Sequence, residues 1–365
     1  MSHKTEFSSL IVTGTRPEII KMMPVYLALK DAGNNVFWCH TGQHQSLAVQ
    51  TFEVFGVTPD FVFDRPEGEG ISSLVAGMLV NIDALLKVNS FKCVLVHGDT
   101  ASTLSGALAA FYNQIPMIVH VEAGLRSGNL SHPFPEESNR LLVAQTANVH
   151  FAPTQASYEA LLAENIAKEK ILVTGNTAID AQYLLLSTGQ IIKRKTEKVL
   201  VTAHRRENWK NIPSISCAIK TLSKLRPELE FVFVLHPNPE VKAKVEAHLG
   251  NTPKVTISEP LGYLELQQQL AESILILSDS GGIQEEAPSY GKRVVVLRET
   301  TERPEAVELG YSVLAGAEDV NRIVSSALAM LDAGDFAENS NPFGDGKASK
   351  RIADTIIALS DSNHV

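Results

Sequence analysis

Residues 278–290 carry the pattern in this chain that is most typical of an anion-binding turn. They read Ser-Asp-Ser-Gly-Gly-Ile-Gln-Glu-Glu-Ala-Pro-Ser-Tyr and follow the apolar run 274–277, which predicts a buried strand. Ser280 stands where a helix N-cap belongs, and Gly281 and Gly282 let the backbone come close to a ligand. The free N–H groups of the next helix would bind a nucleotide diphosphate, and Glu286 could accept hydrogen bonds from ribose hydroxyls. Taken alone, the pattern fits a capped helix without a ligand equally well.

Carboxylates that could act as general acids or bases follow predicted strands in the first half of the chain. Asp99 comes after the apolar run 93–96, Glu122 after the run 117–120, and Glu136 begins a predicted helix. Carboxylates that line an apolar cleft need a cation or a hydrogen-bond donor as a partner, because burying an unpaired charge is costly. The cations that could be such partners are Arg16, Lys21 and Arg140. These residues predict acid–base chemistry, with structural ion pairs as the alternative.

The second half of the chain offers groups suited to phosphate. His204 and Arg205 follow the predicted strand 199–203, and Arg303 lies in a loop after the strand 294–297. A histidine between a strand and arginines favours a phosphate contact or a general-acid role over a satisfied loop histidine. We therefore expect the nucleotide on the second half and the reacting group on the first. No histidine or aspartate pair has metal-ligand spacing, and neither a Walker lysine nor a Gly-x-Gly-x-x-Gly motif occurs, which disfavours a metal site, ATP hydrolysis and nicotinamide binding.

Strands and helices alternate along the whole chain, which predicts α/β domains with parallel sheets. Two Rossmann-like domains facing a cleft are expected: residues 1–180, with a C-terminal helix in 348–365 packing back on them, and residues 181–347. The linker region is placed at 176–197, and residues 60–72 are predicted to be a mobile surface loop. The predicted strands are 8–13, 36–40, 93–96, 117–120, 149–152, 171–174, 199–203, 231–235, 255–257, 274–277 and 294–297.

Composition narrows the classes of function. With 365 residues and a net charge of −9, the chain is long enough for two domains and lacks the basic balance of a nucleic-acid-binding protein. The sequence shows no signal peptide, and no apolar stretch is judged long enough to span a bilayer, so no membrane partner and a cytoplasmic location are expected. The three cysteines lie far apart and are expected to be reduced.

Seven ordered motifs carry a family resemblance. They are Gly14-Thr15-Arg16-Pro17-Glu18, Gly42-Gln43-His44, His97-Gly98-Asp99-Thr100, Glu122-Ala123-Gly124-Leu125-Arg126, Pro135-Glu136-Glu137-Ser138-Asn139-Arg140, His204-Arg205-Arg206-Glu207-Asn208 and Asp279-Ser280-Gly281-Gly282. The chain resembles the bacterial non-hydrolysing UDP-N-acetylglucosamine 2-epimerases over nearly its whole length. The resemblance implies a glycosyltransferase-B-type fold, a cleft site for a UDP-sugar without cofactor or metal, and a homodimer. It also implies interconversion of UDP-GlcNAc and UDP-ManNAc by elimination of UDP to 2-acetamidoglucal and re-addition, supplying precursors for surface polysaccharide.

The resemblance also implies roles for individual residues. Asp99, Glu122 and Glu136 become the acid/base candidates, and His204 would assist the leaving group or bind the diphosphate. Sugar, phosphate and nucleotide contacts would come from Arg16, Lys21, Arg140, Arg205, Ser280, Gly281, Gly282, Glu286 and Arg303. Members that a second UDP-GlcNAc regulates usually continue Gln-His-Arg after the second strand, whereas this chain reads Gln43-His44-Gln45-Ser46. The 64–74 segment departs as well, which counts against substrate activation. Candidate contacts for a second molecule are Gln43, His44, Arg206 and His236.

Three other functions stay open at this point. The same chemistry could act on a modified UDP-sugar, such as a diacetamido-uronic acid or a 6-deoxy N-acetyl sugar, with the loops 128–133 and 64–74 setting the choice. A glycosyltransferase of the same fold would need an acceptor groove and gives no reason for the three carboxylates. A hydrolysing epimerase would release free ManNAc, and the intact Gly-Thr-Arg-Pro-Glu start points away from it.

Overall fold

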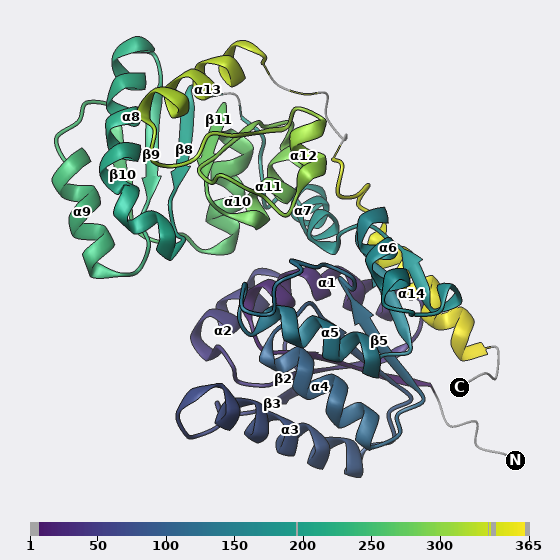
Figure 1. Cartoon of the computed structure of the whole chain (residues 1–365). Coiled ribbons are helices and arrows are strands. Elements are labelled where there is room, and N and C mark those ends of the chain that lie inside the picture. Colours follow the sequence, from purple (N-terminus) through teal and green to yellow (C-terminus); the bar gives the residue numbers. More distant parts are fainter. Residues whose placement is uncertain (1–6, 195, 335, 337–340, 362–365) are drawn as a thin grey trace, which may run out of the picture. The chain divides into compact units, whose positions relative to one another are not determined.

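The chain folds into two compact units in a computed structural model (Figure 1). The structure describes residues 7–194, 196–334, 336 and 341–361, except the side chains of 45–47. One unit comprises the described residues of Met1–Ala181 and Gly344–Val365, and the other is Gln182–Phe343. Helix α7 (Thr177–Ser187) runs across the boundary between them. Each unit is described by itself below.

The first unit is built on a seven-stranded sheet in the order β3-β2-β1-β4-β5-β6-β7, with every neighbouring pair parallel. The strands are short and mostly apolar, as expected where helices cover both faces of a parallel sheet. The strands are β1 (Ser8–Thr13), β2 (Asn35–His40), β3 (Phe61–Val62), β4 (Cys93–His97), β5 (Met117–Val121), β6 (Val149–Ala152) and β7 (Ile171–Val173).

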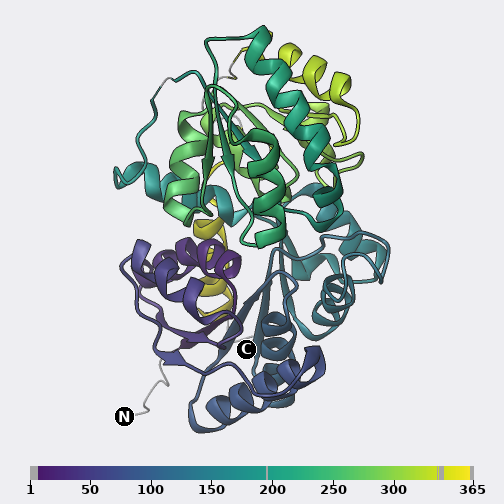
Figure 2. The same ribbon diagram turned by 90° about the vertical axis from the view of Figure 1, so that its left-hand side faces the viewer.

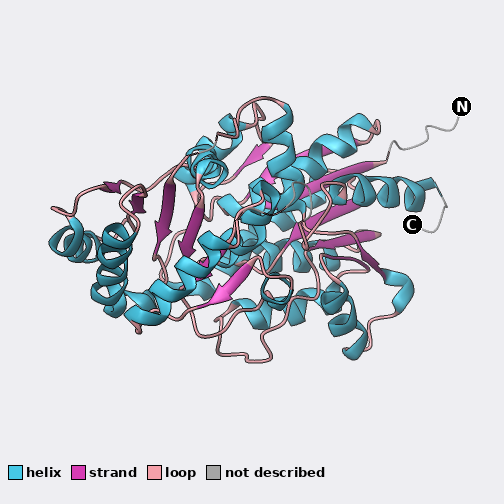
Figure 3. Ribbon diagram, turned by 90° about the horizontal axis from the view of Figure 1, so that it is seen from above, coloured by secondary structure: helices cyan, strands magenta, loops and turns pink. Residues whose placement is uncertain are grey.

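Helices flank this sheet on both faces (Figure 3). Helix α3 packs on α4 and α4 packs on α5, whereas α1 packs on α2 and on the C-terminal helix α14, which lies beside it in Figure 2. The N–H groups of Ala348 and Ser349, at the start of α14, donate to the Asp180 carboxylate at 3.3 and 2.7 Å. The helices are α1 (Arg16–Asp31), α2 (Gln45–Val54), α3 (Gly70–Val88), α4 (Ala101–Tyr112), α5 (Glu136–Thr146), α6 (Gln155–Ala163) and α14 (Ala348–Asp361), with a 3₁₀ turn at Lys168–Lys170.

The second unit repeats the plan with a six-stranded parallel sheet in the order β10-β9-β8-β11-β12-β13. Its strands are β8 (Lys198–Thr202), β9 (Glu230–Val234), β10 (Val255–Ser258), β11 (Leu275–Ser278), β12 (Val294–Val296) and β13 (Ser312–Leu314). Its helices are α8 (Ile212–Leu225), α9 (Pro239–Leu249), α10 (Tyr263–Glu272), α11 (Gly281–Glu286), α12 (Pro304–Glu308) and α13 (Val320–Asp332), with 3₁₀ turns at Arg206–Asn211 and Ala287–Tyr290. Residues of α8, α9 and α13 share one buried apolar core with the strands.

The predicted fold class, α/β with two parallel sheets, is confirmed, and several local predictions were wrong. The predicted loop 60–72 contains β3, and α3 begins inside it at Gly70. Two residues are too few for a strand period to show in the sequence. Strand β13 was missed for the same reason. The predicted linker 176–197 holds the whole of α7, whose Ile179 and Leu185 are fully buried. Residues 362–365 of the predicted C-terminal helix lie outside the described part of the chain.

Helix α3 also corrects the expectation about apolar stretches. Its 19 residues, Gly70–Val88, have a mean hydropathy of 1.6 and are long and apolar enough to cross a membrane by length and composition. A single helix of this kind is weak evidence for a membrane segment. In this fold α3 packs along α4, and its buried residues Met78, Ile82, Leu85 and Leu86 face the core.

Candidate functional site

Each sheet has one point at which the strand order reverses, and the candidate residues gather there. In the first sheet this point lies between β1 and β4, in the second between β8 and β11. In open parallel sheets, ligands bind beyond the carboxyl ends of the strands at such a point. Those ends carry Arg16 after β1, Asp99 after β4, His204 after β8 and Ser280 after β11.

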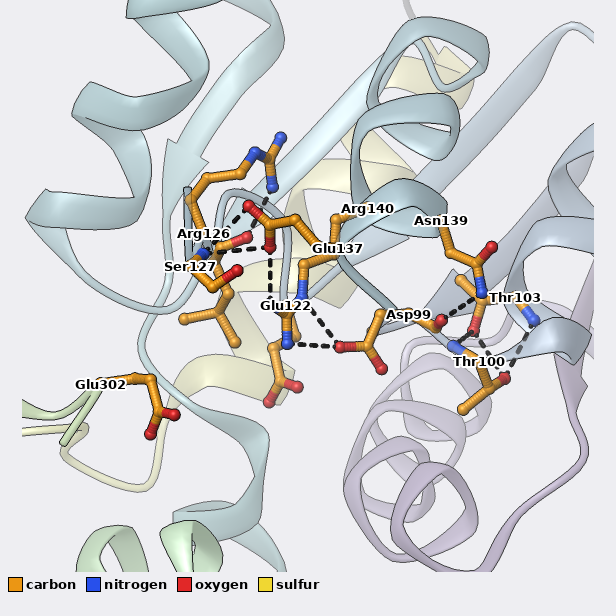
Figure 4. Close-up of polar contacts among 12 residues, drawn as sticks. Asp99, Thr100, Thr103, Glu122, Arg126, Ser127, Glu137, Asn139, Arg140 and Glu302 are labelled. Carbon is orange, nitrogen blue, oxygen red and sulfur yellow. Dashed lines mark hydrogen bonds and ion pairs between the residues drawn. The ribbon is translucent and has the colours of Figure 1, made fainter. Parts of the chain in front are cut away.

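Asp99 is held by a guanidinium. Its Oδ2 accepts from Arg140 Nε at 2.8 Å and lies 2.6 Å from Arg140 Nη2 (Figure 4). The third nitrogen of the same fork, Nη1, donates to Glu137 Oε2 at 2.9 Å. The Asn139 amide donates to the Asp99 carbonyl oxygen at 2.8 Å, which fixes the backbone of the turn. The nearby carboxylates raise the pKa of Arg140 despite the opposing effect of its burial, so this cation is permanent.

Glu122 is held by an ammonium group. Lys21 Nζ makes an ion pair with Glu122 Oε2, and His97 Nε2 lies 3.7 Å from the same oxygen. The side chains of Lys21 and Glu122 are 15% and 13% exposed, so the pair is shielded but reachable. Glu122 has φ +62°, a left-handed conformation that is uncommon for a residue with a side chain and is concentrated at functional sites. The predicted substrate contact Lys21 is thus engaged with a predicted catalytic carboxylate.

A buried carboxylate, Glu18, joins the β1 and β4 loops. Its Oε2 accepts from the N–H groups of Gly14 and Thr15 at 3.1 and 2.8 Å. Its Oε1 accepts from the hydroxyls of Thr100 and Thr103 at 2.8 and 3.1 Å. Burial raises the pKa of Glu18 against the lowering effect of these donors. Glu18 therefore ties the turn before Arg16 to the turn after Asp99.

Two predicted residues of this unit make no such contacts. The side chains of Arg16 and Glu136 are half-buried, and among the described residues neither has a hydrogen-bond or ion-pair partner. Both follow a loop and begin a helix, α1 and α5 respectively. An unpaired cation and an unpaired carboxylate at this edge are available to a ligand.

In the second unit a fully buried aspartate organises the loop that carries His204. Asp279 accepts from the backbone N–H groups of His204 and Arg205 at 3.0 and 2.9 Å, and from the Asn208 amide at 2.9 Å. The same amide donates to the Leu297 carbonyl at 2.9 Å. Asp279 precedes the Ser280 turn, so one carboxylate joins the ends of β8 and β11.

The imidazole of His204 has a defined orientation. Its Nε2 lies 3.1 Å from the Val234 carbonyl oxygen, which can only accept, so Nε2 carries a hydrogen and Nδ1 is the nitrogen left for a ligand. The His236 ring packs edge-on against it, with 5.7 Å between ring centroids, and Trp209 packs on His236. Burial, and secondarily His204, lowers the pKa of His236.

The Ser-Gly-Gly turn has the capped helix start that the sequence predicts. Ser280 Oγ accepts from the N–H of Ile283 at 3.4 Å at the start of α11. The two glycines differ in their surroundings. A Cβ on Gly281 would lie 2.6 Å from Arg303 Nη1, whereas one on Gly282 would meet nothing closer than Ser280 Oγ at 3.9 Å. Arg303 lies against Gly281 because Glu285 binds it, with Nε to Oε1 at 2.8 Å.

Glu286 belongs to a hydrogen-bonded group at the end of α11. Its Oε2 accepts from the Gln267 amide at 2.7 Å, and Gln267 Oε1 accepts from the Tyr290 hydroxyl at 2.8 Å. Gln182, from α7, donates to Gln267 and to the Glu286 carbonyl at 2.8 and 3.1 Å. Burial, with the Glu286 charge, raises the pKa of the Tyr290 hydroxyl, which keeps it a neutral donor.

The candidate contacts for a second ligand are either engaged in hydrogen bonds within their own unit or exposed. Gln43 Oε1 accepts from the N–H and hydroxyl of Ser102 at 3.2 and 2.7 Å, so this amide oxygen is occupied inside the first unit. His44 is exposed, and its N–H donates to the Gly14 carbonyl at 2.9 Å. Arg206 is exposed and lies over the Trp209 ring at 5.9 Å.

Two surface cavities lie away from these residues. One, of about 600 Å³, is lined by Phe111, Tyr112 and Asn148 among others, and another, of about 630 Å³, by Lys220, Lys224 and Lys254 among others. Neither is lined by a residue of the candidate site. Within the described ranges, no three His, Cys, Asp or Glu side chains form a group that could hold a metal ion.

Sequence reasoning missed the residues that hold the site together. Glu18, Glu137 and Asp279 occur in the quoted motifs, but no role was predicted for them. Each is a buried acidic residue at a strand or helix end, and its donors are mostly backbone N–H groups or side chains distant in sequence. One physical argument could have identified these residues. Burying a charged carboxylate is costly unless hydrogen-bond donors surround it, so a buried acidic residue implies such donors.

Comparisons with known proteins agree with this arrangement. A family model described as UDP-N-acetylglucosamine 2-epimerase matches residues 28–357. The UDP-N-acetylglucosamine 2-epimerase of Bacillus subtilis is 41% identical over 359 residues, which cover 95% of this chain and 94% of the relative. The structure of UDP-GlcNAc 2-epimerase from Neisseria meningitidis bound to UDP-GlcNAc superposes with a TM-score of 0.87 at 39% identity, covering 96% of this chain and 100% of that one.

A more distant structure shows the fold alone. The glycotransferase of kitacinnamycin is 12% identical, covers 96% of this chain and 98% of its own, and has a TM-score of 0.62. The predicted glycosyltransferase-B-type fold is confirmed by this likeness together with the two parallel sheets. The family predicted from the ordered motifs is confirmed as well. The chain belongs to the UDP-N-acetylglucosamine 2-epimerase family of enzymes.

Proposed function

We propose that this enzyme epimerises UDP-GlcNAc and UDP-ManNAc at C2 by eliminating UDP and adding it back. The C2 proton of the bound sugar is not acidic, so its direct removal is unfavourable. Cleavage of the C1–O bond, with the electron pair leaving on UDP, creates an oxocarbenium-like centre and makes that proton removable. Loss of the proton gives 2-acetamidoglucal. Return of a proton to the opposite face of C2 and of UDP to C1 completes the inversion, with atoms and charge balanced.

The observation that carries this proposal is the set of carboxylates at one sheet edge with different partners. Asp99 is paired with Arg140, and Glu122 is paired with Lys21. Glu136 is half-buried and has no partner in the described part of the chain. Inversion needs one group that removes a proton and another that delivers one. We assign Asp99, Glu122 and Glu136 to this acid–base work, with Arg16, Lys21 and Arg140 as nearby cations for sugar or phosphate.

We assign the nucleotide to the second unit. Ser280, Gly281 and Gly282 would receive the diphosphate, with Arg205 and Arg303 as neighbouring cations, and Glu286 would accept from the ribose hydroxyls. His204 would face the departing phosphate oxygen with Nδ1, since Nε2 is engaged with the Val234 carbonyl. A relative, the Neisseria meningitidis enzyme, was solved with UDP-GlcNAc bound, which supports this substrate.

We further propose that the enzyme is a cytoplasmic homodimer. Helix α3 exposes the stripe Ser72, Ala76, Val80, Ala84 and Val88, at four-residue spacing, with Val80 and Val88 65% and 80% exposed. A small apolar helix face of this kind favours close packing against a second copy. Free cysteines at 39, 93 and 217 fit a reducing compartment.

A single-turnover reaction tests the proposed mechanism. The enzyme in excess over UDP-GlcNAc, without added cofactor, is quenched at short times and analysed for UDP, 2-acetamidoglucal and UDP-ManNAc. The expected result is that UDP and the glucal rise first and then fall together as UDP-ManNAc accumulates. Free ManNAc would indicate a hydrolysing enzyme. No turnover of UDP-GlcNAc, with turnover of a diacetamido-uronic acid or 6-deoxy UDP-sugar, would move the proposal to a modified substrate.

A further inference from the structure

We infer that Glu137 is a positioning residue for the reaction: it holds Arg140 against Asp99 and anchors the segment 127–135 to the same guanidinium. The inference rests on the proposed function, because it acts through Asp99. Glu137 follows Glu136 directly in α5, yet the two carboxylates have opposite surroundings. Glu136 is half-buried without a partner among the described residues, whereas Glu137 is 3% exposed and carries several hydrogen bonds.

The contacts of Glu137 join three parts of the first unit. Its Oε1 accepts from the N–H groups of Ser127 and Gly128 at 3.0 and 2.9 Å, and its Oε2 accepts from Ser127 N–H at 3.0 Å and from Arg140 Nη1 at 2.9 Å. Figure 4 shows the resulting chain from Ser127 through Glu137 and Arg140 to Asp99. Every link is within one compact unit.

The geometry of the guanidinium explains why the second carboxylate matters. Arg140 uses Nε and Nη2 on Asp99 and Nη1 on Glu137, so the planar fork is fixed from two sides. Burial alone would raise the pKa of Glu137, but the N–H donors of Ser127 and Gly128 and the Arg140 charge bring it below its usual value. Glu137 is thus an anion, and movement of Arg140 away from it would leave a buried negative charge without its cationic partner. A fork with Asp99 as its single partner could rotate and carry the Asp99 carboxylate with it.

The same carboxylate fixes the start of the segment 127–135. Inside it, the Ser127 hydroxyl donates to the His132 carbonyl at 2.6 Å, and His132 N–H donates to the Asn129 carbonyl at 2.9 Å. Leu130 and Phe134 are 59% and 69% exposed, so few apolar contacts hold the segment in place. The segment is therefore held mainly by its hydrogen bonds to Glu137, and the same carboxylate also fixes the position of Arg140. A shift of this segment and a shift of Asp99 are coupled through Glu137.

Glu137→Gln tests the inference, with Glu164→Gln as a matched control. Glu164 makes a bidentate pair with Arg126, at 2.6 and 2.7 Å, in the same unit, and neither residue contacts Asp99 or Arg140 among the described residues. We expect Glu137→Gln to lower kcat about 100-fold, the size of effect that a displaced catalytic group produces, while the Kd for UDP measured by calorimetry stays at the wild-type value. Glu164→Gln should leave both unchanged. Equal kcat in the two variants would overturn the inference.

A double-mutant cycle separates positioning from a general loss of structure. Arg140→Lys removes the planar fork that Glu137 holds, so adding Glu137→Gln to this variant should lower kcat little further. If the two substitutions instead lowered kcat independently, their fold-changes would multiply, and this result would contradict the inference. If Glu137→Gln does not fold, Glu137→Asp replaces it in the experiment. The expected result is then a lowered kcat with unchanged UDP affinity, and a wild-type kcat would contradict the inference. Loss of turnover in the wild-type enzyme itself would instead reject the proposed function, so the two failures are distinguishable.

Discussion

The backbone N–H of His204 donates to the Asp279 carboxylate at 3.0 Å, which joins the loop after β8 to the turn after β11. These two loops meet at the reversal point of the second sheet and carry His204 and Ser280. Asp279 is fully buried and also accepts from Arg205 and Asn208. One acidic side chain thus sets the position of both candidate phosphate-binding elements.

Asp279→Asn should weaken UDP binding and lower the melting temperature together. The amide cannot accept from all three donors, and unsatisfied buried donors cost about 1–3 kcal/mol each. Thermal melts and UDP titrations of the same preparation measure the two effects. A variant that melts lower but binds UDP with wild-type affinity would show that the loop position is not important for the nucleotide.

Asp99→Asn and Glu122→Gln should each reduce kcat strongly, by about 10²–10⁴-fold, while UDP still binds. Both residues lie in the first unit, whereas the proposed nucleotide contacts lie in the second. Steady-state kinetics and UDP calorimetry provide the comparison. Loss of UDP affinity in step with activity would reject the assignment of these carboxylates to acid–base catalysis.

The two glycines of the Ser-Gly-Gly turn should respond differently to alanine. The Cβ of Gly281→Ala would meet Arg303 Nη1 at 2.6 Å, which requires the guanidinium to leave Glu285, while Gly282→Ala meets nothing closer than 3.9 Å. We expect a lower melting temperature for Gly281→Ala than for Gly282→Ala in the absence of ligand. Equal melting temperatures would mean that Arg303 moves aside at no cost.

Acid should remove the stabilising effect of the Arg298–Glu302 pair. The Arg298 side-chain hydrogen bonds, at 2.9 Å to both oxygens, lower the pKa of Glu302 from 4.5 to about 2. A folded-state pKa below the unfolded value stabilises the protein above about pH 4.5, and this stabilisation is lost as the pH falls toward 2. Arg298→Met should therefore melt lower than wild type at neutral pH, with the difference shrinking near pH 2 to 3. A pH-independent difference would contradict this.

Val80→Glu should convert the proposed homodimer into a monomer. Val80 is exposed at the middle of the apolar stripe of α3, where a charge would be buried without a partner on association. Light scattering coupled to size-exclusion chromatography measures the mass. Lys87→Glu, on the same helix but paired with Asp83 rather than in the stripe, is the control. An unchanged dimer in Val80→Glu would exclude this face as the interface.

The sequence predicts the placement of the catalytic candidates better than their partners. Asp99 and Glu122 follow long apolar runs, and a parallel sheet brings the ends of such runs to one edge. The pairing of Lys21 with Glu122 depends on two elements 101 residues apart, so no local pattern reveals it. The choice between Glu136 and Glu137 depends on the rotation of α5, which is set by tertiary packing.

Short elements show the same limit in the fold. The strand β3 has two residues, too few for a sequence signal, whereas the eleven-residue α7 carries an apolar pattern that the linker prediction overlooked. Their positions follow from pairing with β2 and from the burial of Ile179 and Leu185. Long runs such as 8–13 and 93–97 were predicted within one or two residues of their ends.

The most direct test follows the C2 proton during turnover. Enzyme and UDP-GlcNAc are mixed in deuterated water without added cofactor, and the sugar is observed by proton NMR. We expect deuterium to appear at C2 in both sugars while a UDP-ManNAc signal grows. UDP-ManNAc that forms with its C2 proton retained from the substrate would contradict exchange at the carboxylates, and with it the roles of Asp99, Glu122 and Glu136.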